Sequence, residues 1–183
     1  MSNDELGLIQ RAQRGDAAAC AALYDRHYDA VYRYCYYRVG DVALAQDVAS
    51  EVFVRMVEKL DSFKPRGRPL LAWLYTIARN LIADSHRRQG RTTHLPLDEA
   101  LTVGQESLTQ DVERSLLADC LRIALRHLTE DQRQVILLKF MENHTNAQVA
   151  RMLRKTEGSI KSLQHRALGS LRRALERERC YEA

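Results

Sequence analysis

The sequence predicts an all-α protein of two small helical domains joined by a flexible linker. Apolar residues return every three or four positions, and we find no alternation of the kind that marks strands. Glycine and proline, which interrupt helices, number only 8 and 3 among 183 residues. Charge is also segregated: residues 64–91 carry a net charge of +6 and residues 92–113 carry −5, although the whole chain carries only +4. An acidic stretch of weak periodicity between periodic segments has the composition of a linker.

These patterns divide the chain into a first domain of residues 1–91, an acidic linker of 92–113 and a second domain of 114–183. Two separated basic segments, 64–91 and 154–183, suggest two contacts with a polyanion. The linker has two interpretations. It either keeps the chain soluble, or mimics a nucleic-acid strand and occupies the basic segments until a partner displaces it.

In the first domain, cap residues delimit three helices. The first is expected over residues 4–14, before Gly15, and the second begins after Asp16 and ends near Gly40. Asp41 caps a third helix that continues to about Leu60. The tyrosines of the second helix are expected in the core and at helix contacts. The third helix has an apolar stripe of small and branched residues, Ala45, Val48, Ala49, Val52 and Met56.

The first domain is expected to close with a basic loop over residues 62–69 and a helix over 72–91. Trp73, Ile77 and Leu81 recur at helical spacing and are expected on a buried stripe, which leaves the basic residues on the accessible side. An ordinary core helix with solvated charges explains this segment equally well when it is taken alone. The second basic segment favours contact with nucleic acid.

The second domain has the layout of a helix-turn-helix. A helix through residues 116–128 precedes another capped by Thr129, with acidic residues in its first turn. A short amphipathic helix is then expected over 145–153, a polar turn over 154–159, and a longer basic helix from Ile160 onward. This order places the last helix in a DNA major groove. A helical hairpin with a solvated face is the alternative.

The residues give no indication of an enzyme, a cofactor or a metal site. The four cysteines stand far apart, so we expect reduced thiols, and the six histidines show no metal-ligand spacing. A phosphate-binding glycine loop is absent. No apolar run reaches the roughly 18 to 20 residues that span a bilayer, and the N-terminus lacks a signal core, so a cytoplasmic location is expected.

Over nearly its whole length the chain resembles the extracytoplasmic-function (ECF) sigma factors of bacterial RNA polymerase, members of the sigma-70 family. One group of motifs resembles sigma region 2: Leu23-Tyr24, Ala45-Gln-Asp-Val-Ala-Ser-Glu-Val-Phe53, Trp73-Leu-Tyr-Thr-Ile-Ala-Arg-Asn80, Asp84 and Arg87-Arg88. A second group resembles sigma region 4: Leu128-Thr-Glu-Asp-Gln-Arg-Gln-Val-Ile136, Ala147-Gln-Val-Ala150 and Gly158-Ser-Ile-Lys-Ser162. Two motif groups in this order are far more specific than either alone.

The resemblance implies that the chain binds core RNA polymerase, at the clamp helices of the largest subunit and at the flap. Asp47, Ser50 and Glu51 would lie on the face that contacts the clamp helices. An acidic face on an otherwise basic protein suits a protein partner better than DNA. The family also implies an anti-sigma factor that covers these faces. Ser50 stands where the family often has glutamine.

The resemblance further implies two DNA-binding sites. The minus-ten element, with a base flipped from its non-template strand, would contact Lys64, Arg66, Arg68, Arg79, Asn80, Arg87 and Arg88. The minus-thirty-five element would contact Ser159, Lys161, Ser162, His165 and Arg166. Leu163 stands where the family often has arginine, and Gln148 where it often has glutamate, so the promoter sequence cannot be carried over.

The predicted function is therefore promoter-specific initiation: binding core polymerase, reading two elements and promoting DNA melting. The alternative is a polymerase-independent transcription regulator that uses only the helix-turn-helix of residues 129–175. That alternative leaves Asp47, Glu51 and the basic helix over 72–91 without a purpose.

Overall fold

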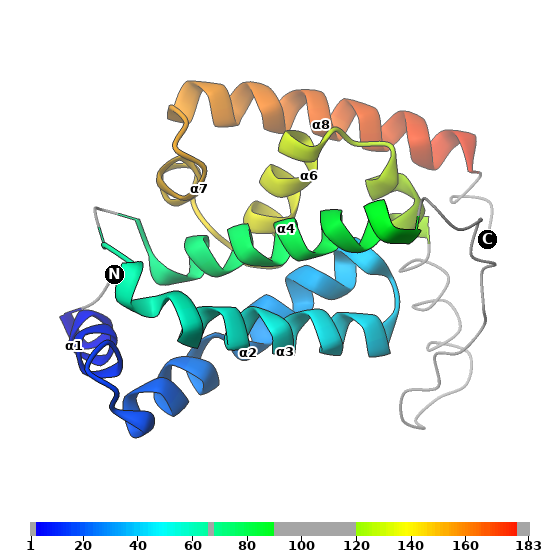
Figure 1. The fold of residues 1–183 in the computed structure, drawn as a ribbon. Helices are drawn as coiled ribbons and strands as arrows, with labels where there is room; N and C mark the ends of the chain where they lie inside the picture. The colour runs from blue at the N-terminus through cyan, green and yellow to red at the C-terminus, as the bar shows by residue number, and fades with distance from the viewer. Residues whose placement is uncertain (1–2, 66–67, 90–119, 179–183) are drawn as a thin grey trace, which may run out of the picture.

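The computed structural model describes residues 3–65, 68–89 and 120–178, and within these ranges it contains helices and no strand. In Figure 1, α4 lies between two layers, with α2 and α3 on one side and α6, α7 and α8 on the other. The elements in chain order are α1 (Asn3–Ala12), α2 (Ala17–Val39), α3 (Val42–Lys59), η1 (Leu60–Ser62), α4 (Leu70–Gln89), helical turns at 120–126, α6 (Glu130–Ile136), η2 (Leu137–Met141), α7 (Asn146–Leu153) and α8 (Glu157–Arg177).

The predicted caps of α2 and α3 are confirmed. The Asp16 carboxylate accepts a hydrogen bond from the backbone N–H of Ala19, and the Asp41 carboxylate accepts one from Leu44. Each satisfies a backbone donor that has no partner within the helix. Gly40 ends α2 with φ of 79°, a left-handed conformation that glycine adopts without a steric penalty. Helix α1 ends at Ala12, two residues earlier than expected.

We call α1 to α4 the first helical unit and the helices of residues 120–178 the second. The core of the first unit forms where α2, α3 and α4 pack against one another. The predicted stripe of α3 is buried throughout. In α4 the buried stripe differs by one residue from the prediction: Leu74, Ala78 and Ile82 are at most 2 % exposed, whereas Trp73, Ile77 and Leu81 are only partly buried. Because α4 has helices on both sides, its apolar surface is wider than the single stripe that the periodicity predicted.

Two capping boxes organise the second helical unit. The Thr129 and Thr145 hydroxyls cap α6 and α7. In each box, the side-chain oxygen of the glutamine three residues later accepts a hydrogen bond from the backbone N–H of the threonine. The turn between α7 and α8 is shorter than predicted. Thr156 caps α8 by accepting from the Ser159 N–H, so the helix begins at Glu157 and the predicted start near Ile160 is wrong.

Cys120 is disulfide-bonded, which corrects the expectation that all four cysteines are reduced thiols. Cys20 and Cys35 are free. The predicted linker, 92–113, lies outside the described residues, as do the first residues of the predicted second domain. None of the described helices combines the length and apolar character that crossing a membrane requires.

Candidate functional site

The outer face of α3 carries the acidic residues predicted to contact a protein partner. Asp47 and Ser50 are exposed, and Glu51 is partly exposed. The Glu51 carboxylate accepts a hydrogen bond of 2.7 Å from Arg55, one helical turn later, so its charge is locally balanced. Sequence reasoning missed this pairing, although the spacing of four residues is a signal that could have found it.

Two exposed valines lie on the same side of α3, nearer its C-terminal end. Val54 is 50 % exposed and Val57 is 57 % exposed. They add a small apolar area to the charged side of α3. Together with Asp47, Ser50 and Glu51 they form what we call the α3 face.

A basic strip runs along the start of α4 and its preceding loop. Arg68 is partly buried, and its Nη2 donates to the backbone oxygen of Ala72 at 2.7 Å and to the Thr76 hydroxyl. Burial, followed by the nearby charges of Arg154 and Arg79, lowers the pKa of Arg68. The guanidinium is therefore held in a fixed position among other cations.

The other predicted minus-ten residues are spread more widely. Lys64 and Asn80 are exposed, and Arg87 is exposed and pairs with Asp84. Arg68 and Arg79 line one cavity, and Lys64, Asn80 and Arg87 do not. Arg66 and the side chain of Arg88 lie outside the described residues.

Helix α8 presents the predicted minus-thirty-five residues on one side. Its opposite side packs inward through Ile160, Leu163, Ala167 and Leu171. Ser159 is partly exposed, and the side chains accessible to solvent are Lys161, Ser162, His165 and Arg166. Because α7 packs across α8, the pair has the helix-turn-helix arrangement in which the second helix enters a groove.

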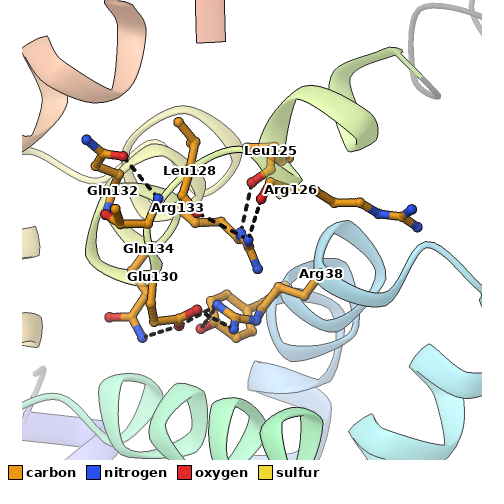
Figure 2. Close-up of polar contacts among 10 residues, drawn as sticks. Arg38, Leu125, Arg126, Leu128, Glu130, Gln132, Arg133 and Gln134 are labelled. Atoms are coloured by element: carbon orange, nitrogen blue, oxygen red, sulfur yellow. Dashed lines mark hydrogen bonds and ion pairs between the residues drawn. The ribbon is translucent and has the colours of Figure 1, made fainter. Parts of the chain in front are cut away.

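The two helical units dock through arginines of the first unit and carboxylates of the second. Arg38 of α2 makes two hydrogen bonds, of 2.7 and 2.8 Å, with the Glu130 carboxylate. Figure 2 shows Glu130 reaching toward Arg38, while Arg133 turns to the carbonyls of Leu125, Arg126 and Leu128. Burial opposes ionisation of Glu130, but the Arg38 guanidinium outweighs it, and the pKa of the carboxyl falls below its ordinary value.

Two more contacts join the same units. Arg33 makes two hydrogen bonds with Glu142, of 3.1 and 3.0 Å. In a third contact the arginine belongs to the second unit. Arg122 donates to the backbone oxygen of Gly40 in the first unit at 2.8 Å and lies over the Tyr36 ring. No periodicity or motif could have predicted these pairs, because their partners stand 82 to 109 residues apart. Among the described residues, no three histidine, cysteine or acidic side chains converge as metal ligands would.

A helical chain with a basic strip and a helix-turn-helix has the features of the class of DNA-binding transcription proteins. The family model for Sigma-70 region 2 matches residues 23–92, and that for Sigma-70, region 4 matches residues 124–173. The chain belongs to the ECF sigma factors of the sigma-70 family.

Curated relatives agree with these matches. The ECF RNA polymerase sigma factor SigL of Mycobacterium tuberculosis is 34% identical over 173 residues, which cover 92% of this chain and 95% of SigL. The ECF RNA polymerase sigma factor BldN of Streptomyces coelicolor is 41% identical over 170 residues, covering 92% of this chain. The match spans 64% of BldN.

Solved structures support the fold. CnrH, in complex with the cytosolic domain of CnrY, matches with a TM-score of 0.70 and 22% identity, covering 96% of this chain and 98% of that one. The sigma factor RpoE, in complex with the anti-sigma factor NepR from Bartonella quintana, matches with a TM-score of 0.63 and 25% identity, covering 85% and 96%.

Proposed function

We propose that this chain is a promoter-specificity subunit that binds core RNA polymerase, reads a minus-ten and a minus-thirty-five element, and promotes DNA melting. It catalyses no reaction itself. The observation that carries the proposal is the presence of both sigma regions in one chain, each with its own accessible surface. The polymerase works on DNA in the cytoplasm, and we place the chain there.

The α3 face is the polymerase contact. Asp47, Ser50 and Glu51 meet the clamp helices of the largest subunit, and Val54 and Val57 supply apolar area that water leaves on binding. Acidic residues at the border of such a contact steer encounter with a basic partner. The second unit contacts the flap.

The promoter contacts are divided between the two units. Lys64, Arg66, Arg68, Arg79, Asn80, Arg87 and Arg88 serve the minus-ten element. Holding a flipped base there must offset an unstacking cost of a few kcal/mol. On α8, Lys161 and Arg166 contact guanine edges or phosphates of the minus-thirty-five element, and Ser159, Ser162 and His165 border them.

An anti-sigma factor is a further expected partner. RpoE of Bartonella quintana has been solved with one, NepR. We extend that kind of partner to this chain because its α3 face and its α8 face are both open to a covering protein.

The polymerase-independent regulator is the second candidate function, and the observations favour it less. It needs only the second unit, yet residues 23–92 match sigma region 2.

The polymerase contact is tested by charge reversal on α3. We expect the double variant Asp47→Arg, Glu51→Arg to lose most of its affinity for core polymerase, because like charges brought together cost several kcal/mol. The matched control is Asp25→Arg, Asp29→Arg, which reverses two exposed carboxylates at the same spacing on α2. Equal loss in both variants, measured by fluorescence anisotropy of labelled protein, would contradict the assignment of the α3 face.

A further inference from the structure

A cavity lies between the two helical units, where the α7–α8 turn faces α4. Its volume is about 330 Å³, within the range of small-molecule sites. Arg68 and Arg79 line it from the first unit, and Arg154 and Lys155 line it from the turn of the helix-turn-helix. Four cationic side chains therefore line one space, together with the carboxylate of Asp131.

Only one of these four cations is balanced by a carboxylate. Lys155 lies 2.9 Å from Asp131, whereas Arg68, Arg79 and Arg154 have no ion pair with any described residue. Arg154 and Arg79 lower the pKa of Arg68 by their charge, after burial, so the three repel one another in this arrangement. An anion in the cavity would remove that repulsion.

The cavity wall is already organised for hydrogen bonding. Arg68 is held by Ala72 and Thr76, and its Nε is buried without a hydrogen-bond partner among the described residues. A guanidinium fixed in advance loses little side-chain entropy when it binds an anion.

The backbone at Arg154 determines which variant tests this residue. This residue ends α7 in the left-handed region, with φ of 55°. Asparagine or glycine occupies such a position with less strain than arginine does. The conformation is that of an ordinary helix C-cap, because the backbone N–H groups of Arg154 and Lys155 both donate to the Ala150 oxygen, and the Arg154 side chain is part of the cavity wall.

We propose that this cavity binds a small polyphosphate anion, inorganic or part of a nucleotide, which bridges the two units through Arg68, Arg79 and Arg154. Arginine suits this ligand because its planar guanidinium pairs with phosphate oxygens by two parallel hydrogen bonds. Since Arg68 and Arg79 are also proposed minus-ten residues, the bound anion competes with promoter DNA and holds the helix-turn-helix docked over them.

The test is calorimetric titration of the full chain with inorganic triphosphate, without magnesium and at constant ionic strength. We expect saturable binding, weakened about tenfold by Arg154→Asn and by Arg79→Gln, since each loses a charged hydrogen bond. Asparagine keeps the left-handed backbone at position 154. Arg151→Gln is the matched control, because Arg151 is exposed on α7 and does not line the cavity.

A parallel titration with a nucleoside triphosphate distinguishes the two sources. Equal affinities would assign binding to the phosphate chain, and tighter nucleotide binding would assign part of it to the nucleoside. No saturable binding, or the same affinity in Arg151→Gln, Arg154→Asn and Arg79→Gln proteins with unchanged circular dichroism, would overturn the proposal. The binding test does not depend on the promoter role, so its failure leaves the sigma assignment in place.

Discussion

Arg38 and Glu130 form a two-hydrogen-bond ion pair between α2 and α6, and the Arg38 side chain is only 4 % exposed. Arg38 also donates to the Tyr34 hydroxyl at 3.2 Å, and Gln134 donates to Glu130. The pair therefore belongs to a network that links the segments matching sigma regions 2 and 4. Removing the carboxylate would leave an uncompensated buried charge on Arg38. Such a charge strongly destabilises the docked arrangement unless water reaches the guanidinium.

Reversing the charge at Glu130 is expected to separate the two units. In Glu130→Arg protein, Arg38 faces a like charge and regains hydration only when the units move apart, so the radius of gyration rises while helix content is kept. Small-angle X-ray scattering and circular dichroism measure both quantities. Adding Arg38→Glu is expected to restore part of the compaction, and Glu58→Arg, on the exposed side of α3, is the control. An unchanged radius of gyration in Glu130→Arg protein would refute the role of this pair.

Truncation of basic residues on α8 is expected to weaken promoter binding in a salt-dependent way. Where Lys161 or Arg166 contacts a phosphate, replacement by alanine makes the plot of log affinity against log salt less steep, by about 0.9 in the magnitude of its negative slope. Where the residue contacts a guanine edge, the variant loses about 1–3 kcal/mol of sequence discrimination instead. Anisotropy titrations on matched and scrambled duplexes separate the two cases. Arg177→Ala, at the far end of α8, is the control, and equal behaviour of all three variants would rule out the assigned contact.

The pair of Glu5 and His27 is expected to make stability depend on acidic pH. His27 Nε2 lies 3.0 Å from Glu5 Oε1, both side chains are buried, and the close contact with His27 lowers the pKa of Glu5. A lowered folded-state pKa stabilises the fold above the ordinary value of 4.5, and that stabilisation is lost as pH falls through the folded pKa. Urea unfolding between pH 3 and 6 should show less pH dependence in Glu5→Gln than in the parent, and parallel curves would contradict this.

Loss of the cap on α8 is expected to destabilise the helix-turn-helix. Thr156→Ala removes the hydroxyl that accepts from the Ser159 N–H, at a cost of about 1 kcal/mol of unfolding free energy. Thr156→Ser keeps the acceptor and serves as the control. Chemical denaturation followed by circular dichroism measures both variants, and equal loss in the two would show that the hydroxyl contributes nothing.

Local interactions made much of the fold predictable from sequence. The caps at Asp16, Asp41 and Thr129 act within three residues, so residue type and spacing identified them. Thr156 acts in the same way but was missed, because residues 154–159, which include Gly158, were predicted to form a polar turn. A glycine near the start of a helix does not prevent the cap from forming.

The interactions between the units were beyond sequence reasoning. Arg38 and Glu130 are 92 residues apart, and nothing in the periodicity of either helix selects the other. Tyr75 of α4, which is 5 % exposed, stacks on Tyr34 of α2, so the buried surface of α4 extends past its predicted stripe. The sequence predicted Arg68 and Arg79 as contacts of the minus-ten element, but only the fold shows that they line one cavity with Arg154.

Run-off transcription with purified core RNA polymerase, this chain and a library of upstream sequences tests the central claim most directly. The account predicts initiation at promoters that share two separated elements, lost in Asp47→Arg, Glu51→Arg protein and kept in Asp25→Arg, Asp29→Arg protein. Sequence-specific DNA binding without polymerase-dependent initiation, using a polymerase that is active with another sigma factor, would contradict it and favour a regulator that acts alone.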